Sequence, residues 1–193
     1  MNGKILFLAG SARKESMNKK LARHAYSLAL EKGADASFID LADYPMPIYD
    51  GDLEASEGLP ENAKKLKQVF IEHQGLFIAS PEYNSSLSPL LKNSIDWISR
   101  PERSDEVALV AFATKIAALS ATSGGKLGGL RGLVPLRMLL GNIGVDVMGS
   151  QLAVAAYGEA FDRTGNLVDA SALAALDALL DKLIVRVDRF NRA

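Results

Sequence analysis

The sequence contains no cysteine and only two histidines among its 193 residues. The absence of cysteine excludes disulfides, thiol catalysis, iron–sulfur clusters and cysteine zinc sites. Two histidines, His24 and His73, are too few for a multi-histidine metal site. We therefore expect no metal site of these kinds and no chemistry that depends on a thiol.

An excess of charge of one sign and long apolar runs are also lacking. Lysine and arginine total 22, and aspartate and glutamate total 23, which leaves a formal net charge of −1. A nucleic-acid-binding protein usually has a large basic excess, because contacts with phosphates provide most of its affinity. No apolar run approaches the roughly 20 residues of a membrane span, and residues 1–10 lack the features of a signal peptide. We expect a cytoplasmic protein that binds neither nucleic acid nor membrane.

The composition and the length are those of one ordinary globular domain. Hydrophobic residues make up 48% and charged residues 23% of the chain, both close to the averages for such proteins. One hydrophobic core serves chains of up to roughly 250 residues. We therefore expect residues 1–193 to form a single domain.

Strand and helix signals alternate along the chain. Short apolar runs, typical of strands buried on both faces, predict strands at residues 5–9, 37–41, 76–79, 116–120 and 145–154. Helical periodicity predicts a helix that ends at Gly33, one that begins near Pro60, and helices at 89–97, 130–142 and 171–190. Residues 44–58 are expected to be a loop and 100–106 a polar connection, while 107–112 fit a helix or a strand equally.

This alternation predicts an α/β fold in which helices cover both faces of a parallel sheet. In such sheets ligands bind beyond the carboxyl ends of the strands, at the switch in strand order. The loops after the first, third and fourth predicted strands are therefore the segments where a functional site is expected.

The loop after the first strand, residues 10–18, has the composition of a phosphate site. It precedes a helix N-terminus, whose unpaired N–H groups and positive dipole end favour an anion. Hydroxyl, amide and guanidinium donors that suit a phosphate are present in Ser11, Arg13, Ser16 and Asn18. The alternative is that Ser16 or Asn18 only caps the helix.

The same loop carries neither of the two glycine-rich nucleotide motifs. A Walker loop requires Gly-x-x-x-x-Gly-Lys-Ser/Thr and the dinucleotide fingerprint requires Gly-x-Gly-x-x-Gly, whereas Gly10 is the only glycine here. Hydroxyl side chains in place of glycines indicate a loop that wraps one terminal monophosphate. This favours FMN over FAD or a bound nicotinamide dinucleotide.

The loops after the third and fourth strands suit an aromatic heterocycle. Pro81 stiffens residues 80–86, and Tyr83 offers a flat apolar face; an incidental surface tyrosine is the alternative. The loop after the fourth strand is residues 122–129, and its last six positions hold four glycines, which allows a ligand to approach the backbone closely. For this third loop a flexible connection is the alternative.

Taken in order, these segments resemble the NAD(P)H-dependent FMN reductases with a flavodoxin-like fold, a family that includes quinone, azo and chromate reductases. Gly10-Ser11-x-Arg13-x-x-Ser16-x-Asn18 is similar to the family's phosphate loop. Pro81-Glu82-Tyr83-Asn84, followed by Leu91-Lys92-Asn93-x-Ile95-Asp96-Trp97, is similar to its isoalloxazine loop and the next helix. Residues 120–125 are similar to its third flavin-contacting loop.

The resemblance implies a flavodoxin-like three-layer sandwich whose five-stranded parallel sheet has the order 2-1-3-4-5. It implies FMN as cofactor, NADPH or NADH as electron donor, and a quinone, flavin, azo compound or similar small molecule as acceptor. The hydride chemistry belongs to the cofactor, so no catalytic side chain is expected. The implied FMN contacts are Ser11, Arg13, Ser16, Met17, Asn18, Pro81, Glu82, Tyr83, Asn84, Ser120, Ser123, Gly124 and Gly125.

A homodimer or homotetramer, with the flavin near a subunit interface, is also implied by the resemblance. Trp97, Ile98 and Arg100 are candidates for that interface, and core packing is the alternative for Trp97. The chain departs from the family after Asn84, where Gly-Ser-x-Pro-Gly is usual. It reads Ser85-Ser86-Leu87-Ser88-Pro89, so the proline is shifted by one position, the glycine is lost and the turn beside the flavin is altered.

Two other functions are compatible with the same fold. An electron carrier like flavodoxin is usually strongly acidic, which helps it to dock on protein partners, and the net charge of −1 argues against it. A flavin-free regulatory domain is the second alternative, because fold does not determine function. A receiver domain of that kind would carry acidic residues after the first strand, where Ala9-Gly10-Ser11 stand.

Overall fold

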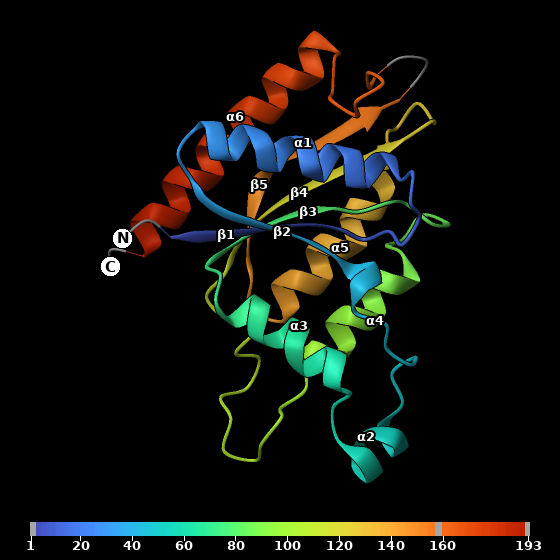
Figure 1. The fold of residues 1–193 in the computed structure, drawn as a ribbon, viewed down its shortest axis with the longest axis vertical. Coiled ribbons are helices and arrows are strands. Elements are labelled where there is room, and N and C mark those ends of the chain that lie inside the picture. Colours follow the sequence, from blue (N-terminus) through green and yellow to red (C-terminus); the bar gives the residue numbers. More distant parts are fainter. Residues whose placement is uncertain (1–2, 157–159, 192–193) are drawn as a thin grey trace.

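A five-stranded sheet with helices on both faces forms the centre of the computed structural model, which describes residues 3–156 and 160–191 (Figure 1). Every strand pair is parallel, and the order is β2-β1-β3-β4-β5. The predicted fold class and strand order are therefore confirmed. The strands are β1 (Lys4–Ala9), β2 (Asp35–Asp40), β3 (Gly75–Ala79), β4 (Ile116–Ser123) and β5 (Asp146–Ala155).

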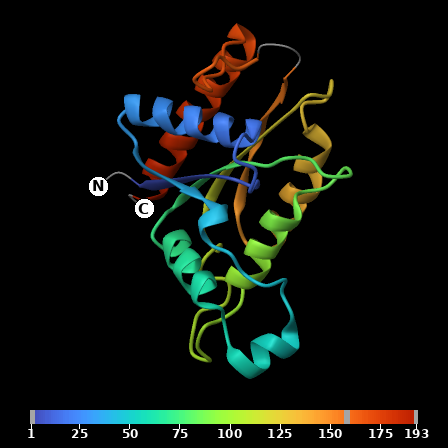
Figure 2. The same ribbon diagram turned by 45° about the vertical axis from the view of Figure 1, so that its right-hand side comes forward.

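The helices form two layers, one on each face of the sheet (Figures 1 and 2). One layer holds α1 (Met17–Glu31) and α6 (Ala170–Phe190), and the other holds α3 (Glu61–Ile71), α4 (Pro89–Ile98) and α5 (Leu130–Asn142). Successive side chains of a strand point to opposite faces. In β1, Phe7 accordingly packs in the core beneath α1 and α6, and Leu8 packs in the other core. No helix in the described ranges is long and apolar enough to cross a membrane.

Helix α1 lies close to the sheet because its buried face is made largely of alanines. Ala22, Ala25 and Ala29 are fully buried. The hydroxyl of Ser16 caps the helix by accepting the Lys19 backbone N–H at 3.4 Å. The buried Lys19 ammonium group in turn pairs with Asp40, at the end of β2, at 2.6 Å. These contacts fix the start of α1 relative to the carboxyl ends of the strands.

The prediction of a loop over residues 44–58 is wrong in part, because this segment contains helix α2 (Gly51–Glu57). The carboxylate of Asp50 caps it by accepting the N–H groups of Asp52 and Leu53 at 2.8 and 3.4 Å. The helix buries no residue and projects away from the sheet (Figure 2). A short exposed helix has no apolar stripe, which is why periodicity did not reveal it. A 3-10 turn, Leu41–Asp43, precedes this segment.

Residues 45–50 lie along α4 and bury Trp97. The indole N–H donates to the Pro47 carbonyl at 2.8 Å, and Asn93 binds both that carbonyl and the Tyr49 N–H. Trp97 and Ile98 are fully buried within the subunit, and Arg100 is paired with Glu54 at 2.8 Å. Core packing therefore describes Trp97, and neither it nor Ile98 is available for a subunit interface.

Residues 107–112 form neither a helix nor a strand but a run of turns. Their last residues, Ala111 and Phe112, are fully buried beside α3 and α5. The segment before them is held by Glu106, which pairs with the buried ammonium group of Lys67 at 2.6 Å. The run is apolar because its last residues are buried. It shows neither a helical nor a strand period because the segment is irregular.

Lys115 is a buried lysine at the amino end of β4, opposite the site loops. Its side chain donates to the backbone carbonyl of His73, and its relative exposure is 5%. Burial lowers its pKa to about 8 from the 10.5 of an exposed lysine. Between these two values the unfolded chain holds a proton that the folded protein has lost. The free energy of unfolding therefore rises with pH across this range.

We predict that this rise depends on Lys115. Between pH 7 and pH 10.5 the wild type should gain about 3 kcal/mol of stability relative to the Lys115→Met variant. Urea unfolding followed by circular dichroism at several pH values measures the difference. The matched control is Lys65→Met, which replaces an exposed lysine. If the difference in the free energy of unfolding between wild type and Lys115→Met were the same at every pH, the prediction would be contradicted.

Candidate functional site

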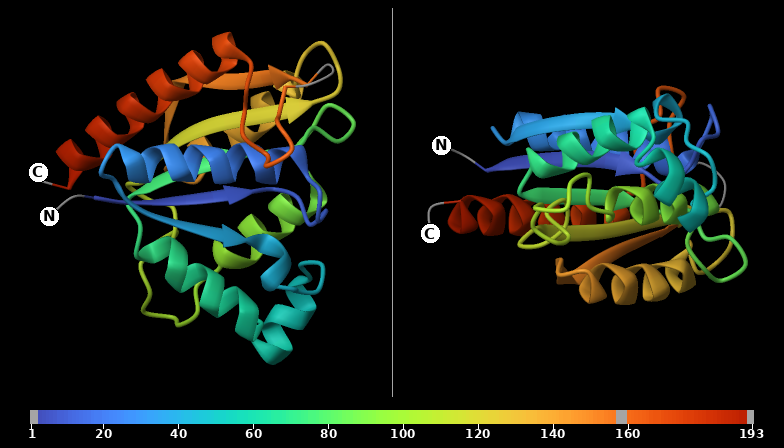
Figure 3. Two further views of the ribbon diagram at one scale, coloured as in Figure 1. Left: turned by 45° about the horizontal axis from the view of Figure 1, so that its top comes forward. Right: turned by 90° about the horizontal axis from the view of Figure 1, so that it is seen from below.

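The loops after β1, β3 and β4 gather at one end of the sheet (Figure 3, left). They enclose a cavity of about 230 Å³. It lies where β1 has β2 on one side and β3 on the other, which is the switch in strand order where α/β proteins bind ligands. Its lining residues are Ser11, Arg13, Ser16, Met17, Asn18, Pro81, Glu82, Tyr83, Thr122, Ser123 and Gly124.

After the first loop, the N-terminus of α1, which suits an anion, borders this cavity. The first N–H groups of a helix have no partner within it, and α1 begins at Met17 in the cavity wall. The buried hydroxyl of Ser11 accepts the Arg13 N–H at 3.3 Å, which shapes the turn. The Arg13 side chain is exposed and makes no ion pair within the described residues. It is therefore free to meet a charged ligand.

Asn18 connects the first loop to the third. Its amide nitrogen donates to the Thr122 carbonyl at 2.9 Å, and its amide oxygen accepts the Thr122 N–H at 3.0 Å. Only 4% of Asn18 is exposed. The residue lines the cavity, but its side chain also holds the start of α1 against the end of β4.

The second loop is a tight turn that is made without glycine. Tyr83 and Ser86 bond to each other through two backbone hydrogen bonds of 2.9 and 3.0 Å. Between them Asn84 and Ser85 have φ values of 52° and 66°, in the left-handed region that costs energy for residues other than glycine. Ser88 then caps α4, where Pro89 occupies the first turn, and donates its hydroxyl to the Gly10 carbonyl. Ser85, which stands where the family usually has glycine, is therefore held in a strained backbone conformation within this turn.

The glycines of the third loop have separate roles. Gly128 has φ 57°, and a Cβ placed on it would lie 2.5 Å from the carbonyl carbon of Val154. It is therefore required by close packing of the chain against β5. Gly124 borders the cavity, whereas the exposed Gly125 does not and donates its N–H to the Ser123 hydroxyl at 3.3 Å.

Three residues predicted to contact the cofactor do not line the cavity. Asn84 lies in the exposed turn, and Ser120 is fully buried in the sheet, where its hydroxyl faces the Ile78 carbonyl at 3.5 Å; Gly125 is the third. The lining also includes Thr122, which lies in the segment 120–125 predicted to contact the flavin but was not among the contact residues named individually. The strand was expected to end at residue 120, whereas β4 continues to Ser123. Had the fourth strand been predicted to continue through the small residues after residue 120, Thr122 would have been placed at the carboxyl end of the sheet.

The chemistry of this lining fits FMN. Hydroxyls, a helix N-terminus and the guanidinium of Arg13 suit a phosphate at one end, and Pro81, Tyr83 and Gly124 suit a flat ring. Among the residues that the structure describes, the buried Thr122 hydroxyl oxygen has no hydrogen-bond partner. An orphaned polar atom in the wall of a cavity is a feature that a polar ligand can explain.

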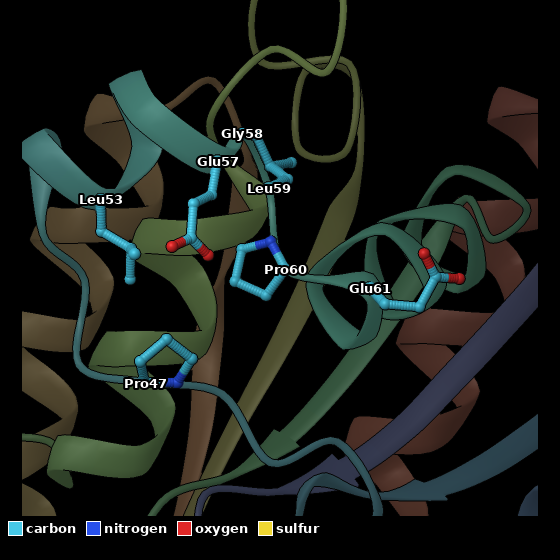
Figure 4. Close-up of a pocket in the computed structure, with 7 residues that line it drawn as sticks. All are labelled: Pro47, Leu53, Glu57, Gly58, Leu59, Pro60 and Glu61. Carbon is cyan, nitrogen blue, oxygen red and sulfur yellow. The ribbon is translucent and has the colours of Figure 1, made fainter.

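A larger cavity, of about 340 Å³, lies between α2 and the start of α3 (Figure 4). Its walls are Pro47, Leu53, Leu59 and Pro60, and it carries two carboxylates, those of Glu57 and Glu61, and no basic side chain. Two carboxylates disfavour a phosphate electrostatically. The smaller cavity at the strand ends is therefore the candidate flavin site.

Strand order, the loop before α1 and a cavity at the switch point define the flavodoxin-like class of α/β proteins. Within this class, residues 3–159 match the family described as NADPH-dependent FMN reductase. The chain therefore belongs to this family of NAD(P)H-dependent oxidoreductases that use FMN.

Named relatives agree with this assignment. The chain is 34% identical over 171 residues to an NADPH:quinone oxidoreductase of Arabidopsis thaliana, covering 86% of this chain and 82% of the relative. It is 31% identical over 180 residues to a 2-hydroxy-1,4-benzoquinone reductase of a Burkholderia species, with 93% of each covered. A solved structure of the flavoenzyme NAD(P)H:(acceptor) oxidoreductase FerB from Paracoccus denitrificans superposes with a TM-score of 0.82. Its sequence identity is 26%, with 97% of this chain and 98% of that chain covered.

We predict that Asn18→Ala lowers both stability and FMN affinity. The change removes two buried hydrogen bonds, which should lower the free energy of unfolding by about 2 kcal/mol, and it loosens the first loop from the third. Urea unfolding and an FMN titration measure the two effects. Asn62→Ala is the control, since it removes one exposed hydrogen bond, to the Pro45 carbonyl. Wild-type values for both quantities would contradict the prediction.

Proposed function

We propose that the protein binds FMN in the cavity at the strand ends and reduces a quinone or a similar small acceptor at the expense of NADPH or NADH. The proposal rests on one observation. The start of α1, which suits a phosphate, and the residues that suit a flat ring line the same cavity. The names of the relatives, which include quinone reductases, support the class of acceptor.

When bound, FMN supplies the acceptance and donation of hydride; the chain binds and orients it. In the proposed arrangement Ser11, Arg13, Ser16 and the first N–H groups of α1 hold the phosphate. Tyr83 is 45% exposed and presents its ring at the rim, where a planar acceptor can stack. We assign no catalytic side chain, because the one carboxylate in the lining, that of Glu82, is already paired with Arg131.

The proposed FMN contacts are the predicted residues that also line the cavity. The remaining three, Asn84, Ser120 and Gly125, support the loops instead: Asn84 shapes the second turn, Ser120 fills the sheet and Gly125 closes the third loop. Thr122 joins the proposed set, since its unpartnered hydroxyl is part of the wall.

The proposal includes a single FMN-binding domain over residues 1–193 and a homodimer or homotetramer. An exposed apolar stripe on α5 supports self-association: Leu130, Val134 and Met138, spaced four residues apart, are 39%, 65% and 64% exposed. Apolar surface of this kind on a helix favours a protein contact. The proposal also places the protein in the cytoplasm, where a reductase has access to NAD(P)H.

The test of the function is a visible spectrum of the purified protein. The protein is mixed with FMN, desalted, and measured before and after anaerobic addition of NADPH, and then of a quinone. We expect a flavin band that survives desalting, bleaches with NADPH and returns with the quinone. A band that persists with both NADPH and NADH would indicate an electron carrier. A folded protein without a flavin band would refute FMN binding.

We predict that Arg13→Ala weakens FMN binding by on the order of 1.5–3 kcal/mol, the range for a hydrogen bond to a charged group. The loss should be smaller for riboflavin, which lacks the phosphate, so the two ligands are titrated in parallel. Arg103→Ala, which removes an arginine whose side chain is 73% exposed, is the control. Equal FMN affinity in wild type and Arg13→Ala would show that Arg13 does not bind the phosphate.

A further inference from the structure

Glu82 differs from the other cavity residues because its carboxylate is bound to a neighbouring helix. One oxygen accepts the Arg131 side-chain N–H at 2.8 Å, and the other accepts the Arg131 backbone N–H at 3.2 Å. The Glu82 side chain is 11% exposed, whereas that of Arg131 is 62% exposed. The carboxylate thus caps the first turn of α5 from a loop 49 residues away.

The first turn of α5 has little support of its own. Its N-cap is Gly129, which has no side chain, and the turn contains no acidic residue. Pro135 lies inside the helix and has no N–H to donate to the Arg131 carbonyl. Gly132 further weakens the turn, since glycine is a poor helix former. A carboxylate at a helix N-terminus is stabilising, and here Glu82 provides it from outside the helix.

The second site loop and α5 are also closely packed at Gly132. A Cβ on Gly132 would lie 3.0 Å from the Ser86 carbonyl oxygen and 3.2 Å from Glu82 Cα. The loop itself holds Asn84 and Ser85 in the left-handed region. Such strain persists only where surrounding contacts maintain it, and the contacts with α5 are in a position to do so.

We propose that Glu82 is a positioning residue that holds the ring-facing loop, residues 81–86, through its bond to the start of α5. This inference rests on the proposed function, since it concerns the same cavity. The Glu82 carboxylate acts through Arg131 and α5, while the rest of the residue lines the cavity among the proposed FMN contacts. FMN affinity and the surroundings of the ring then depend on the stability of a helix that lies outside the lining.

The experiment compares Glu82→Ala, Glu82→Gln and Arg131→Ala with wild type and with the control Glu57→Ala, which removes an exposed glutamate on α2. Three quantities are measured: the Kd for FMN, the visible spectrum of bound FMN, and hydrogen exchange at the Arg131 and Gly132 amides of the flavin-free protein. Circular dichroism establishes that each variant is folded.

Glu82→Ala should raise the Kd for FMN about tenfold, shift the flavin band and accelerate exchange at both amides. Glu82→Gln should have an intermediate effect, because one carbonyl oxygen can still accept a bond. Arg131→Ala should have the smallest effect of the three, since the carboxylate keeps the backbone N–H. The control should match wild type in every measurement.

A second-site variant separates positioning from direct contact. Pro135→Ala restores an N–H that can bond to the Arg131 carbonyl, so adding it to Glu82→Ala should recover part of the FMN affinity and slow the exchange again. A residue that only touched the flavin would gain nothing from this change in α5.

Two outcomes would overturn the proposal: an unchanged Kd and spectrum in folded Glu82→Ala, or a raised Kd with wild-type exchange at Arg131 and Gly132. If Glu82→Ala does not fold, Glu82→Gln and Arg131→Ala are judged by the same criteria. Failure of the proposed function is recognised separately, because wild type itself would then bind no FMN. In that case unchanged amide exchange in the flavin-free variants would still refute the link to α5.

Discussion

The parallel pairing of β1 between β2 and β3 is the constraint on which the site depends. Parallel strands place their carboxyl ends at one edge of the sheet, and each needs a crossover that returns over a face. The loops after β1, β3 and β4 therefore meet although they lie far apart in the sequence. The switch in strand order at β1 leaves room between them, and that room is the cavity at the strand ends that we propose as the flavin site.

Each of the three loops is tied to a neighbour by a side chain. Ser88 bonds to the Gly10 carbonyl, Asn18 bonds twice to Thr122, and Glu82 bonds twice to Arg131. The bonds of Ser88 and Asn18 are buried and use backbone groups, whereas those of Glu82 reach one backbone N–H and one side-chain N–H of the exposed Arg131. A cavity held in this way needs less ordering when a ligand binds, which favours affinity. The FMN reductase family to which the chain belongs requires such a cavity, because the chemistry resides in a cofactor that must be oriented.

The fold and the loops that line the candidate site were predictable, because their signals are local. Apolar runs such as residues 5–9 mark buried strands, helical periods separate them, and a hydroxyl-rich turn before a helix marks an anion site. The short helix α2 was missed because it buries nothing and has no period. Thr122 fell within the predicted third loop but was not named as a contact, because a run of small residues gives no sign of where β4 ends. The burial of Trp97 could not be decided, since an apolar helix face fits a core and an interface equally.

The sequence by itself determined the fold class, the family and the segments that form the site, because each rests on short patterns of residues. Only the tertiary structure decided how the site is held together. Asn18 meets Thr122 across 104 positions and Glu82 meets Arg131 across 49, and no local pattern encodes such pairs. They arise because the sheet brings distant turns to one edge, where the hydrogen-bonding groups left unpaired in one loop find partners in the next.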